Sequence, residues 1–278
     1  MAGDTTFQLP DGTARFHRSW LPAGPPRAAV AIIHGFGEHS ERYTALTEAL
    51  PLRGFAVHGF DLLGHGRSPG PRGHIDRWSD YRDGVSAFVD LVSGQWPKVP
   101  VFLFAHSMGG LIALEWLVCE AAADRSRVAG AVLSAPALIP LDVGRRWQLW
   151  MSRLLSRGWP RFSVDVPLGA VSSDPAVQAA NREDPLSHRR ASARWAQESL
   201  AAIARARAGA ASVTLPLLIV HGEADPIVDI AGSRWLLDAV SSADRQLRTY
   251  PGAFHEVHND QARELLVADV LAWLEAHL

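Results

Sequence analysis

The sequence of 278 residues is poor in cysteine and lysine and has no long apolar run. Its single cysteine, Cys119, excludes an intrachain disulfide and a metal site built from several thiolates. We interpret Cys119 as a small buried apolar residue. No stretch reaches the roughly 18 consecutive apolar residues of a membrane span, and the first residues lack the charged start and apolar run of a signal peptide. These absences predict a cytoplasmic protein.

The metal and nucleotide motifs that a sequence can carry are also missing. No pair of histidines shows H-x-x-x-H or H-E-x-x-H spacing on a predicted helix, so we expect no metal. No G-x-G-x-x-G opens a helix after a strand, so we expect no cofactor. The formal net charge of −2 argues against a nucleic-acid partner. Charge is uneven, because residues 140–212 hold eleven arginines against six acidic residues.

What the sequence does have is a regular alternation of apolar runs and helical patterns. Residues 28–33 form a continuous apolar run, typical of a strand buried on both faces of a parallel sheet. Similar runs are predicted as strands at 55–60, 99–104, 128–134 and 215–220, with a shorter strand at 246–250 and an N-terminal hairpin at 6–9 and 14–20. Helices are predicted over 43–53, 79–93, 107–123, 230–240 and 261–277. This order predicts the α/β class, with a mostly parallel, doubly wound sheet.

The alternation stops near Pro136 and resumes at Leu215. The interrupting segment contains amphipathic helical pieces. We therefore predict a core made of residues 1–136 and 214–278, with residues 137–213 inserted as a helical cap over the carboxyl edge of the sheet.

The most informative motif is the pentapeptide AHSMG at residues 105–109. It follows an apolar run and precedes a helical pattern, which is the context of a nucleophile elbow. Such a turn requires small residues two positions before and after the serine. Gly109 meets this requirement, and Ala105 adds only one methyl group. The pattern predicts Ser107 as a nucleophile.

A serine hydroxyl needs a base to take its proton and an acid to orient that base. In an α/β sheet these groups follow later strands in the order serine, acid, histidine. Asp225 follows the strand that ends at 220, and His255 follows the strand at 246–250. Asp229 and His258 are the nearby competitors. We rank Asp229 lower because it stands where a helix N-cap or first-turn acid is expected. We rank His258 lower because it lies closer to the start of the final predicted helix.

When a serine attacks a carbonyl group, the carbonyl oxygen becomes negatively charged, and this oxyanion needs two convergent backbone N–H groups. Met108, directly after the predicted nucleophile, provides one. The second is expected in the loop after the strand that ends at Ile33, where Phe36 stands between two glycines. The oxyanion hole is therefore predicted to consist of the Phe36 and Met108 amides.

Several of these segments resemble one family. The segments are HGFGEHSERY at 34–43, DLLGHGRS at 61–68 and PRGHI at 71–75, together with the elbow and the two later loops. They are similar to the motifs of the monoacylglycerol lipases and related lysophospholipases, a branch of the α/β-hydrolases. The match spans residues 32–259, and Ala105 departs from the usual glycine. The resemblance implies an α/β-hydrolase fold and a lipid ester substrate.

The predicted cap offers candidates for substrate binding. Apolar residues recur at helical spacing across 142–157, and we predict that Trp147, Trp150, Met151 and Leu154 line the acyl pocket. Arginines surround this stripe. Basic amphipathic helices with tryptophan suit anionic interfaces, so we also expect a peripheral contact between the cap and an anionic membrane.

We therefore predict a serine carboxylic-ester hydrolase that cleaves monoacylglycerols to fatty acid and glycerol through an acyl-enzyme. A lysophospholipase and a broad short- or medium-chain carboxylesterase are the alternatives within the same chemistry. An aminopeptidase would need cap carboxylates to hold a free amine, for which Glu183 and Asp184 are the candidates. A ligand-binding protein without activity is the alternative from another class, because fold alone does not imply catalysis.

Overall fold

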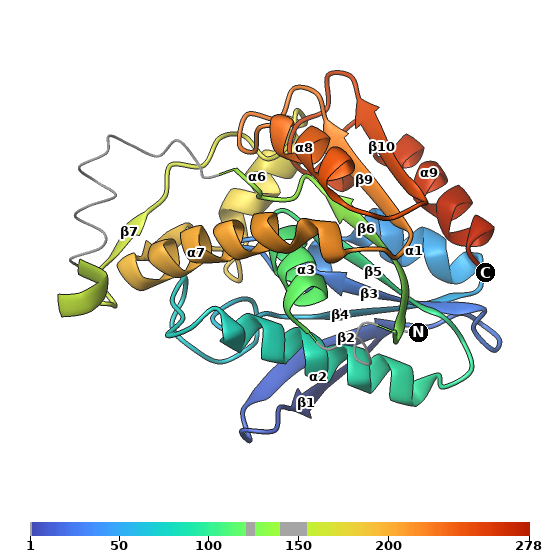
Figure 1. Ribbon diagram of the computed structural model, residues 1–278, viewed down its shortest axis with the longest axis horizontal. Coiled ribbons are helices and arrows are strands. Elements are labelled where there is room, and N and C mark those ends of the chain that lie inside the picture. The colour runs from blue at the N-terminus through green and yellow to red at the C-terminus, as the bar shows by residue number, and fades with distance from the viewer. Residues whose placement is uncertain (1, 121–125, 140–154) are drawn as a thin grey trace.

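The computed structural model describes residues 2–120, 126–139 and 155–278, and a sheet of eight strands runs through it (Figure 1). The strands are β1 (Ala2–Gln8), β2 (Ala14–Trp20), β3 (Ala28–Ile33), β4 (Phe55–Phe60), β5 (Val101–His106), β6 (Val128–Ser134), β9 (Leu217–Gly222) and β10 (Arg245–Tyr250). They lie in the order β1-β2-β4-β3-β5-β6-β9-β10. The pairs β1–β2 and β2–β4 are antiparallel, and the other pairs are parallel. The predicted α/β class with a mostly parallel sheet is confirmed.

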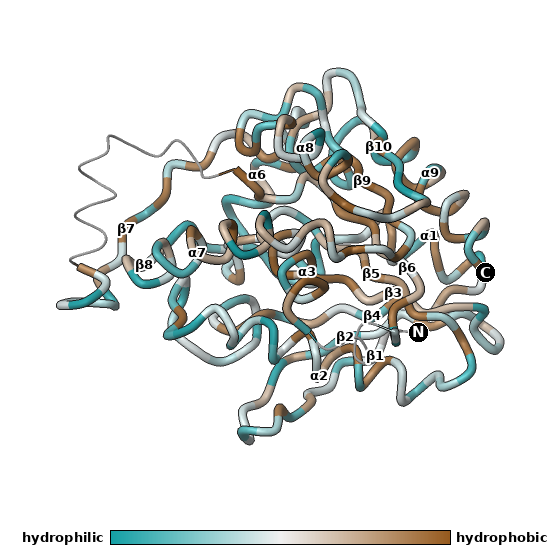
Figure 2. Tube along the Cα trace, viewed as in Figure 1, coloured by the Kyte–Doolittle hydropathy of each residue, from teal (hydrophilic) through white to brown (hydrophobic). Residues whose placement is uncertain are grey.

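Helices cover both faces of this sheet (Figure 1). They are α1 (Thr44–Leu52), α2 (Ser79–Gln95), α3 (Met108–Cys119), α8 (Ala231–Ala239) and α9 (Arg263–Ala276). The odd-numbered side chains of β3 join the core beneath α2, α3 and α8, and its even-numbered side chains join the core beneath α1 and α9. Side chains alternate along a strand, so a strand covered on both faces must be apolar throughout. Figure 2 shows hydrophobic residues along these central strands.

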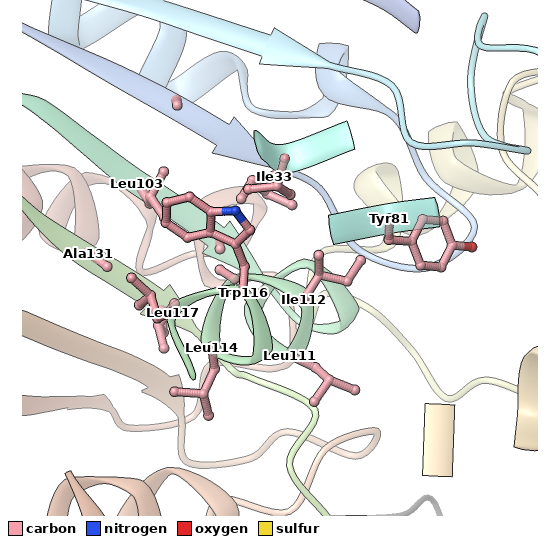
Figure 3. Packing of buried hydrophobic residues seen from close by; sticks show 14 of the residues in the cluster. Ile33, Tyr81, Leu103, Leu111, Ile112, Leu114, Trp116, Leu117 and Ala131 are labelled. Atoms are coloured by element: carbon pink, nitrogen blue, oxygen red, sulfur yellow. The ribbon is translucent and has the colours of Figure 1, made fainter. Parts of the chain in front are cut away.

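Apart from Glu115, helix α3 is built from apolar residues on all sides, and it is buried at the centre of one of these cores. Figure 3 shows Trp116 of α3 pointing toward Leu103 and Ile33 on the neighbouring strands. The indole N–H of Trp116 donates to Ser86 Oγ at 2.8 Å, so the buried polar group is satisfied. A helix without a polar face needs a cover on every side. The sheet covers one side of α3, and neighbouring helices cover the rest.

Between β6 and β9 the chain leaves the sheet. The elements described in this stretch are β7 (Ser163–Asp165), α6 (Pro175–Glu183), β8 (Arg190–Ser192) and α7 (Ala193–Gly209), and β7 pairs with β8. Helix α7 packs across α3 (Figure 1). Arg205 of α7 also pairs at 2.6 Å with Glu115, a fully buried residue of α3. The division into a core and a cap at residues 137–213 stays a prediction.

Several element bounds and one burial differ from the predictions: the first strand is Ala2–Gln8 rather than 6–9, β9 is Leu217–Gly222 rather than 215–220, and α3 is Met108–Cys119 rather than 107–123. Strand β5 continues to His106 rather than ending at 104, because its pairing with β6 extends to Ser134. Ser107 therefore stands alone between the end of β5 and the start of α3. Cys119 was expected to be buried and is exposed, because α3 ends at this residue. Among the helices in the described residues, none combines the length and the hydropathy that crossing a bilayer requires.

Candidate active site

Ser107 occupies a strained turn. Its backbone is left-handed, with φ 55° and ψ −116°, a conformation that disfavours residues with a Cβ atom. Its N–H donates to the carbonyl of Ser134 at 2.8 Å, which holds the turn in place. A Cβ atom on Gly109 would lie 2.3 Å from the carbonyl oxygen of Ile33, so α3 approaches β3 only because this residue is glycine. Ala105, the other small residue of the elbow, is fully buried in β5.

Three side chains from separate loops form one hydrogen-bonded row. The distance from His255 Nε2 to Ser107 Oγ is 2.8 Å, and the distance from His255 Nδ1 to Asp225 Oδ2 is 2.7 Å. A carboxylate only accepts hydrogen bonds, so Nδ1 carries the hydrogen and Nε2 is free to accept the serine proton. The structure thus brings together the three residues that the sequence nominated as nucleophile, base and acid.

Asp225 is held rigidly on its other side. Its Oδ1 accepts hydrogen bonds from the backbone N–H groups of Ile227 at 2.8 Å and Val228 at 3.0 Å. Burial alone would raise the pKa of Asp225, but the charge of His255 and the hydrogen bonds from His221, His255 and Val228 lower it below its usual range. Burial alone would lower the pKa of His255, but the Asp225 carboxylate raises it above 6.5. Asp225 is therefore ionised, and its charge makes His255 a stronger base.

The two competing residues have other partners. Asp229 Oδ1 accepts the N–H of Ala231, the first residue of α8, at 2.8 Å. Asp229 therefore supports a helix start, as its position in the sequence predicts. The ring of His258 is buried and stacks on Tyr43, with ring centroids 4.5 Å apart and planes at 5°. Neither competitor is hydrogen-bonded to Ser107 or His255 among the described residues.

The two amides expected at the oxyanion hole are free of protein partners. Within the described part of the chain, neither Phe36 N–H nor Met108 N–H donates to another group. Met108 is the first residue of α3, and a helix N-terminus favours negative charge. Both residues line the same cavity as Ser107. The geometry leaves these two donors available to an oxygen bound there.

Ser107 and His255 lie in the wall of a cavity that is partly open to solvent. Most side chains around it are apolar, and helix α7 contributes Trp195, Leu200 and Ile203. This face of α7 was not predicted from the sequence. The residues that were predicted to line the acyl pocket lie outside the described residues: Trp147, Trp150, Met151 and Leu154. Their place in the acyl pocket stays a prediction.

A buried group of charged residues behind the site was also missed. Glu38 and Glu256 line the cavity, and Arg42 lies between them. Glu38 and Arg42 fall within the motif at 34–43, which is the only indication of them in the sequence. Nothing in the sequence links these two residues to Glu256. Within the described residues, no group of three or more side chains is arranged to hold a metal ion.

Comparisons with known proteins agree with this geometry. The family model described as serine aminopeptidase, S33, matches residues 24–262. A monoacylglycerol lipase of Mycolicibacterium smegmatis is 34% identical over 93% of this chain and 92% of its own length. The phospholipase YtpA of Bacillus subtilis is 33% identical over 87% of this chain and 93% of its own. The crystal structure of a Paleococcus ferrophilus monoacylglycerol lipase has a TM-score of 0.85 at 30% identity, covering 95% of this chain and 99% of that one.

Proposed function

The chain belongs to the serine aminopeptidase S33 family of α/β-hydrolases and is a serine ester hydrolase, and from this premise we propose that it cleaves monoacylglycerols. The observation that carries the proposal is the hydrogen-bonded row of Ser107, His255 and Asp225 in the wall of an apolar cavity. A lipid ester fits this cavity because its acyl chain is apolar and its reactive carbonyl is close to one end of the molecule.

In the proposed reaction, Ser107 Oγ attacks the ester carbonyl carbon while His255 Nε2 takes the serine proton. The carbonyl oxygen becomes negatively charged and accepts hydrogen bonds from the Phe36 and Met108 amides. As the bond to the alcohol breaks, His255 gives its proton to the departing glycerol oxygen. The acyl-enzyme remains on Ser107. Water then attacks it, with His255 again acting as the base, and the fatty acid leaves.

The two ends of the substrate have chemically different surroundings. The acyl chain is expected to lie against Leu111, Leu200 and Ile203 in the apolar cavity. A second, more polar pocket adjoins it, shares Phe36, Glu38 and Glu256 with it, and is also lined by Asn181 and Arg182 of α6. This polar pocket suits the hydroxyl groups of glycerol, which need hydrogen-bond partners when water is displaced.

A lysophospholipase is the second candidate. The similar phospholipase YtpA favours it, and Arg182 and Arg189 at the polar pocket supply the guanidinium groups that bind phosphate well. An aminopeptidase is disfavoured despite the family's description. Neither Glu183 nor Asp184 lines the cavity around Ser107, and Asp184 is bound to His39 at 2.6 Å.

A substrate panel tests this proposal. We expect kcat/KM to be highest for medium- or long-chain monoacylglycerols, lower for lysophosphatidylcholine and 4-nitrophenyl butyrate, and negligible for a proline arylamide. Ser107→Ala is the control for contaminating hydrolases. Faster turnover of the lysophospholipid would favour the second candidate. Turnover of the arylamide alone would contradict ester hydrolysis.

We also propose a peripheral contact between the cap and an anionic membrane. The segment before and within β7 exposes three apolar side chains, with Trp159 73%, Phe162 51% and Val164 55% exposed. Exposed aromatic residues beside arginines are typical of interfacial segments. The basic excess over residues 140–212 adds attraction to anionic lipid.

Vesicle binding tests this contact. A Trp159→Ala and Phe162→Ala double variant is expected to bind vesicles of phosphatidylglycerol and phosphatidylcholine more weakly than the wild type. Leu52→Ala with Leu265→Ala is the matched control, because these two apolar residues are also exposed but belong to α1 and α9. Equal binding by both double variants would contradict a specific contact through the cap.

A further inference from the structure

The buried charge cluster, which we define as Glu38, Arg42 and Glu256, connects the two loops that flank Ser107. Arg42 Nη2 lies 2.6 Å from Glu256 Oε2, and Arg42 Nε lies 3.4 Å from Glu38 Oε2. All three side chains are at least nine-tenths buried. Glu38 directly follows the loop that carries Phe36, and Glu256 directly follows His255. One arginine therefore bridges the oxyanion loop and the histidine loop.

The cluster holds one more carboxyl group than its single guanidinium can neutralise. Glu256 has the better partners, because it also accepts the Asn259 side-chain amide at 2.9 Å. Burial alone would raise the pKa of Glu256, but Arg42 lowers it. For Glu38, burial and the neighbouring Glu256 carboxylate raise the pKa. Burying an incompletely paired carboxyl group is costly, so a residue such as Glu38 calls for a compensating role.

The contacts of Glu38 indicate that role. Its Oε1 accepts the backbone N–H of Gly35 at 2.5 Å and the hydroxyl of Tyr43 at 2.7 Å. The carboxyl group packs so closely that a Cβ atom on Gly35 would lie 2.8 Å from Oε1 and 3.2 Å from the Ser107 side chain. Glu38 thus fixes the amide of the residue directly before Phe36.

His34 holds the other end of Gly35. Its Nε2 accepts the Leu62 N–H at 2.9 Å, so its Nδ1 carries the hydrogen and donates to the Gly35 carbonyl at 2.8 Å. Burial lowers the pKa of His34 to about 4, which keeps the ring neutral for this pair of bonds. In a trans peptide the C=O and the next N–H point in opposite directions. Fixing the Gly35 carbonyl therefore sets the direction of the Phe36 N–H.

We propose that Glu38 is a positioning residue: it holds the Gly35 N–H while His34 holds the Gly35 carbonyl, and these two bonds together keep the Phe36 N–H aimed at the oxyanion. Arg42 ties this arrangement to the His255 loop through Glu256. Glu38 does not touch the reacting atoms. It acts through the backbone of the oxyanion loop, and its effect is on the transition state, where the oxygen becomes charged. This inference rests on the proposed ester hydrolysis.

Two neutral variants of similar size separate this role from charge and packing. Glu38→Gln keeps an oxygen that can accept the Gly35 N–H, whereas Glu38→Met removes the acceptor. We expect Glu38→Met to lower kcat for a monoacylglycerol by about tenfold to a hundredfold, because misplacing or losing an oxyanion donor costs that much or more. The KM should change by less than about threefold, because an oxyanion donor acts mainly in the transition state. Glu38→Gln should keep kcat within about threefold of the wild-type value, because its side-chain oxygen can still accept the Gly35 N–H.

Tyr43→Phe is the matched control, because it removes the other hydrogen bond to the same carboxyl oxygen and leaves Gly35 bound. It should leave kcat close to the wild-type value. The second-order rate of labelling by a fluorophosphonate, which also needs the oxyanion hole, should follow kcat across the series. Thermal unfolding midpoints verify that each variant is folded, and Glu38→Ala replaces Glu38→Met if the methionine variant does not fold.

The proposal is overturned if Glu38→Met keeps the wild-type kcat, if Glu38→Gln loses as much as Glu38→Met, or if only KM changes. These outcomes are distinct from a failure of the proposed function. In that case the wild-type protein itself would not hydrolyse the ester, and the variants would show no difference in either direction.

Discussion

At the scale of the residue, the ionisation of His255 sets the pH at which the site can work. The base must be neutral to take the serine proton, and its pKa is raised above 6.5 by Asp225 against the effect of burial. We therefore expect kcat/KM for a soluble ester to fall as the pH drops through a midpoint above 6.5. Asp225→Asn should move that midpoint to lower pH and reduce the maximum by roughly a thousandfold to ten-thousandfold. An unchanged midpoint in this variant would contradict the assigned pair.

The residues that can be predicted from their position along the chain are the ones that the structure brings together as a hydrogen-bonded row. Ser107, Asp225 and His255 each follow a strand, and parallel strands bring such loops to one edge. The buried charge cluster gave no comparable signal. Arg42 and Glu256 are 214 positions apart, and a single sequence contains nothing that pairs them. An arginine or glutamate is also most often exposed, so its burial is not expected from its type.

At the scale of the element, the approach of α3 to β3 depends on Gly109. A Cβ atom there would lie 2.3 Å from the carbonyl oxygen of Ile33, the last residue of β3, and 2.5 Å from that of His34, so the backbone would have to shift. Gly109→Ala is therefore expected to lower the thermal midpoint markedly or prevent folding. The measurement is a thermal unfolding scan of purified protein.

Gly94→Ala is the matched control. Gly94 lies within the exposed side of α2, and an added Cβ atom would meet nothing within 4 Å. Alanine has the higher helix propensity, so this change should stabilise the protein by about 0.5–1 kcal/mol. Equal effects of the two substitutions would contradict the close approach at the elbow.

Elements were predictable where local pattern decides them. The run at 28–33 indicated a strand buried on both faces, and the structure confirms it. The end of β5 was placed two residues early, because the strand continues only through its pairing with β6. The pocket-lining face of α7 was not nominated, since Trp195, Leu200 and Ile203 have the spacing of an ordinary packing stripe. An apolar stripe that lines a cavity has the same spacing as one that packs against a core.

At the scale of the whole molecule, we expect buried histidines to make the fold sensitive to acid. Burial lowers the pKa of seven of them below 6.5, to about 4 for His17, His34, His188 and His258, to about 3 for His58, and well below the ordinary value for His65 and His106. The unfolded chain then binds more protons than the folded chain below pH 6.5. We expect the free energy of unfolding, measured with urea, to fall by several kcal/mol per pH unit between about pH 6.5 and 5.

His258→Phe tests this explanation. The ring is fully buried, stacks on Tyr43 and has no hydrogen-bond partner among the described residues for either nitrogen. Phenylalanine keeps the ring and removes one titrating group. The slope of stability against pH should then decrease by up to about 1.4 kcal/mol per pH unit. A stability that is flat from neutral pH to pH 5 in the wild type would contradict the account.

The overall architecture was predictable, but the order of its strands was not. The alternation of strands and helices indicates a parallel sheet, because a strand must be followed by a crossover before the next parallel strand. The observed neighbours β4-β3-β5 depend on contacts between distant segments. The region between β6 and β9 interrupts the alternation, and its pattern did not reveal the ion pair of Arg205 with Glu115 that joins α7 to α3.

The central claim is that Ser107 forms the acyl-enzyme, and covalent labelling tests it most directly. Wild-type protein and Ser107→Ala are treated with a fluorophosphonate and analysed by intact-protein and peptide mass spectrometry, alongside an assay of monoacylglycerol hydrolysis. The account predicts a single adduct on the peptide that contains Ser107, and neither adduct nor hydrolysis in Ser107→Ala. An adduct on another residue, or substantial hydrolysis by folded Ser107→Ala protein, would contradict it.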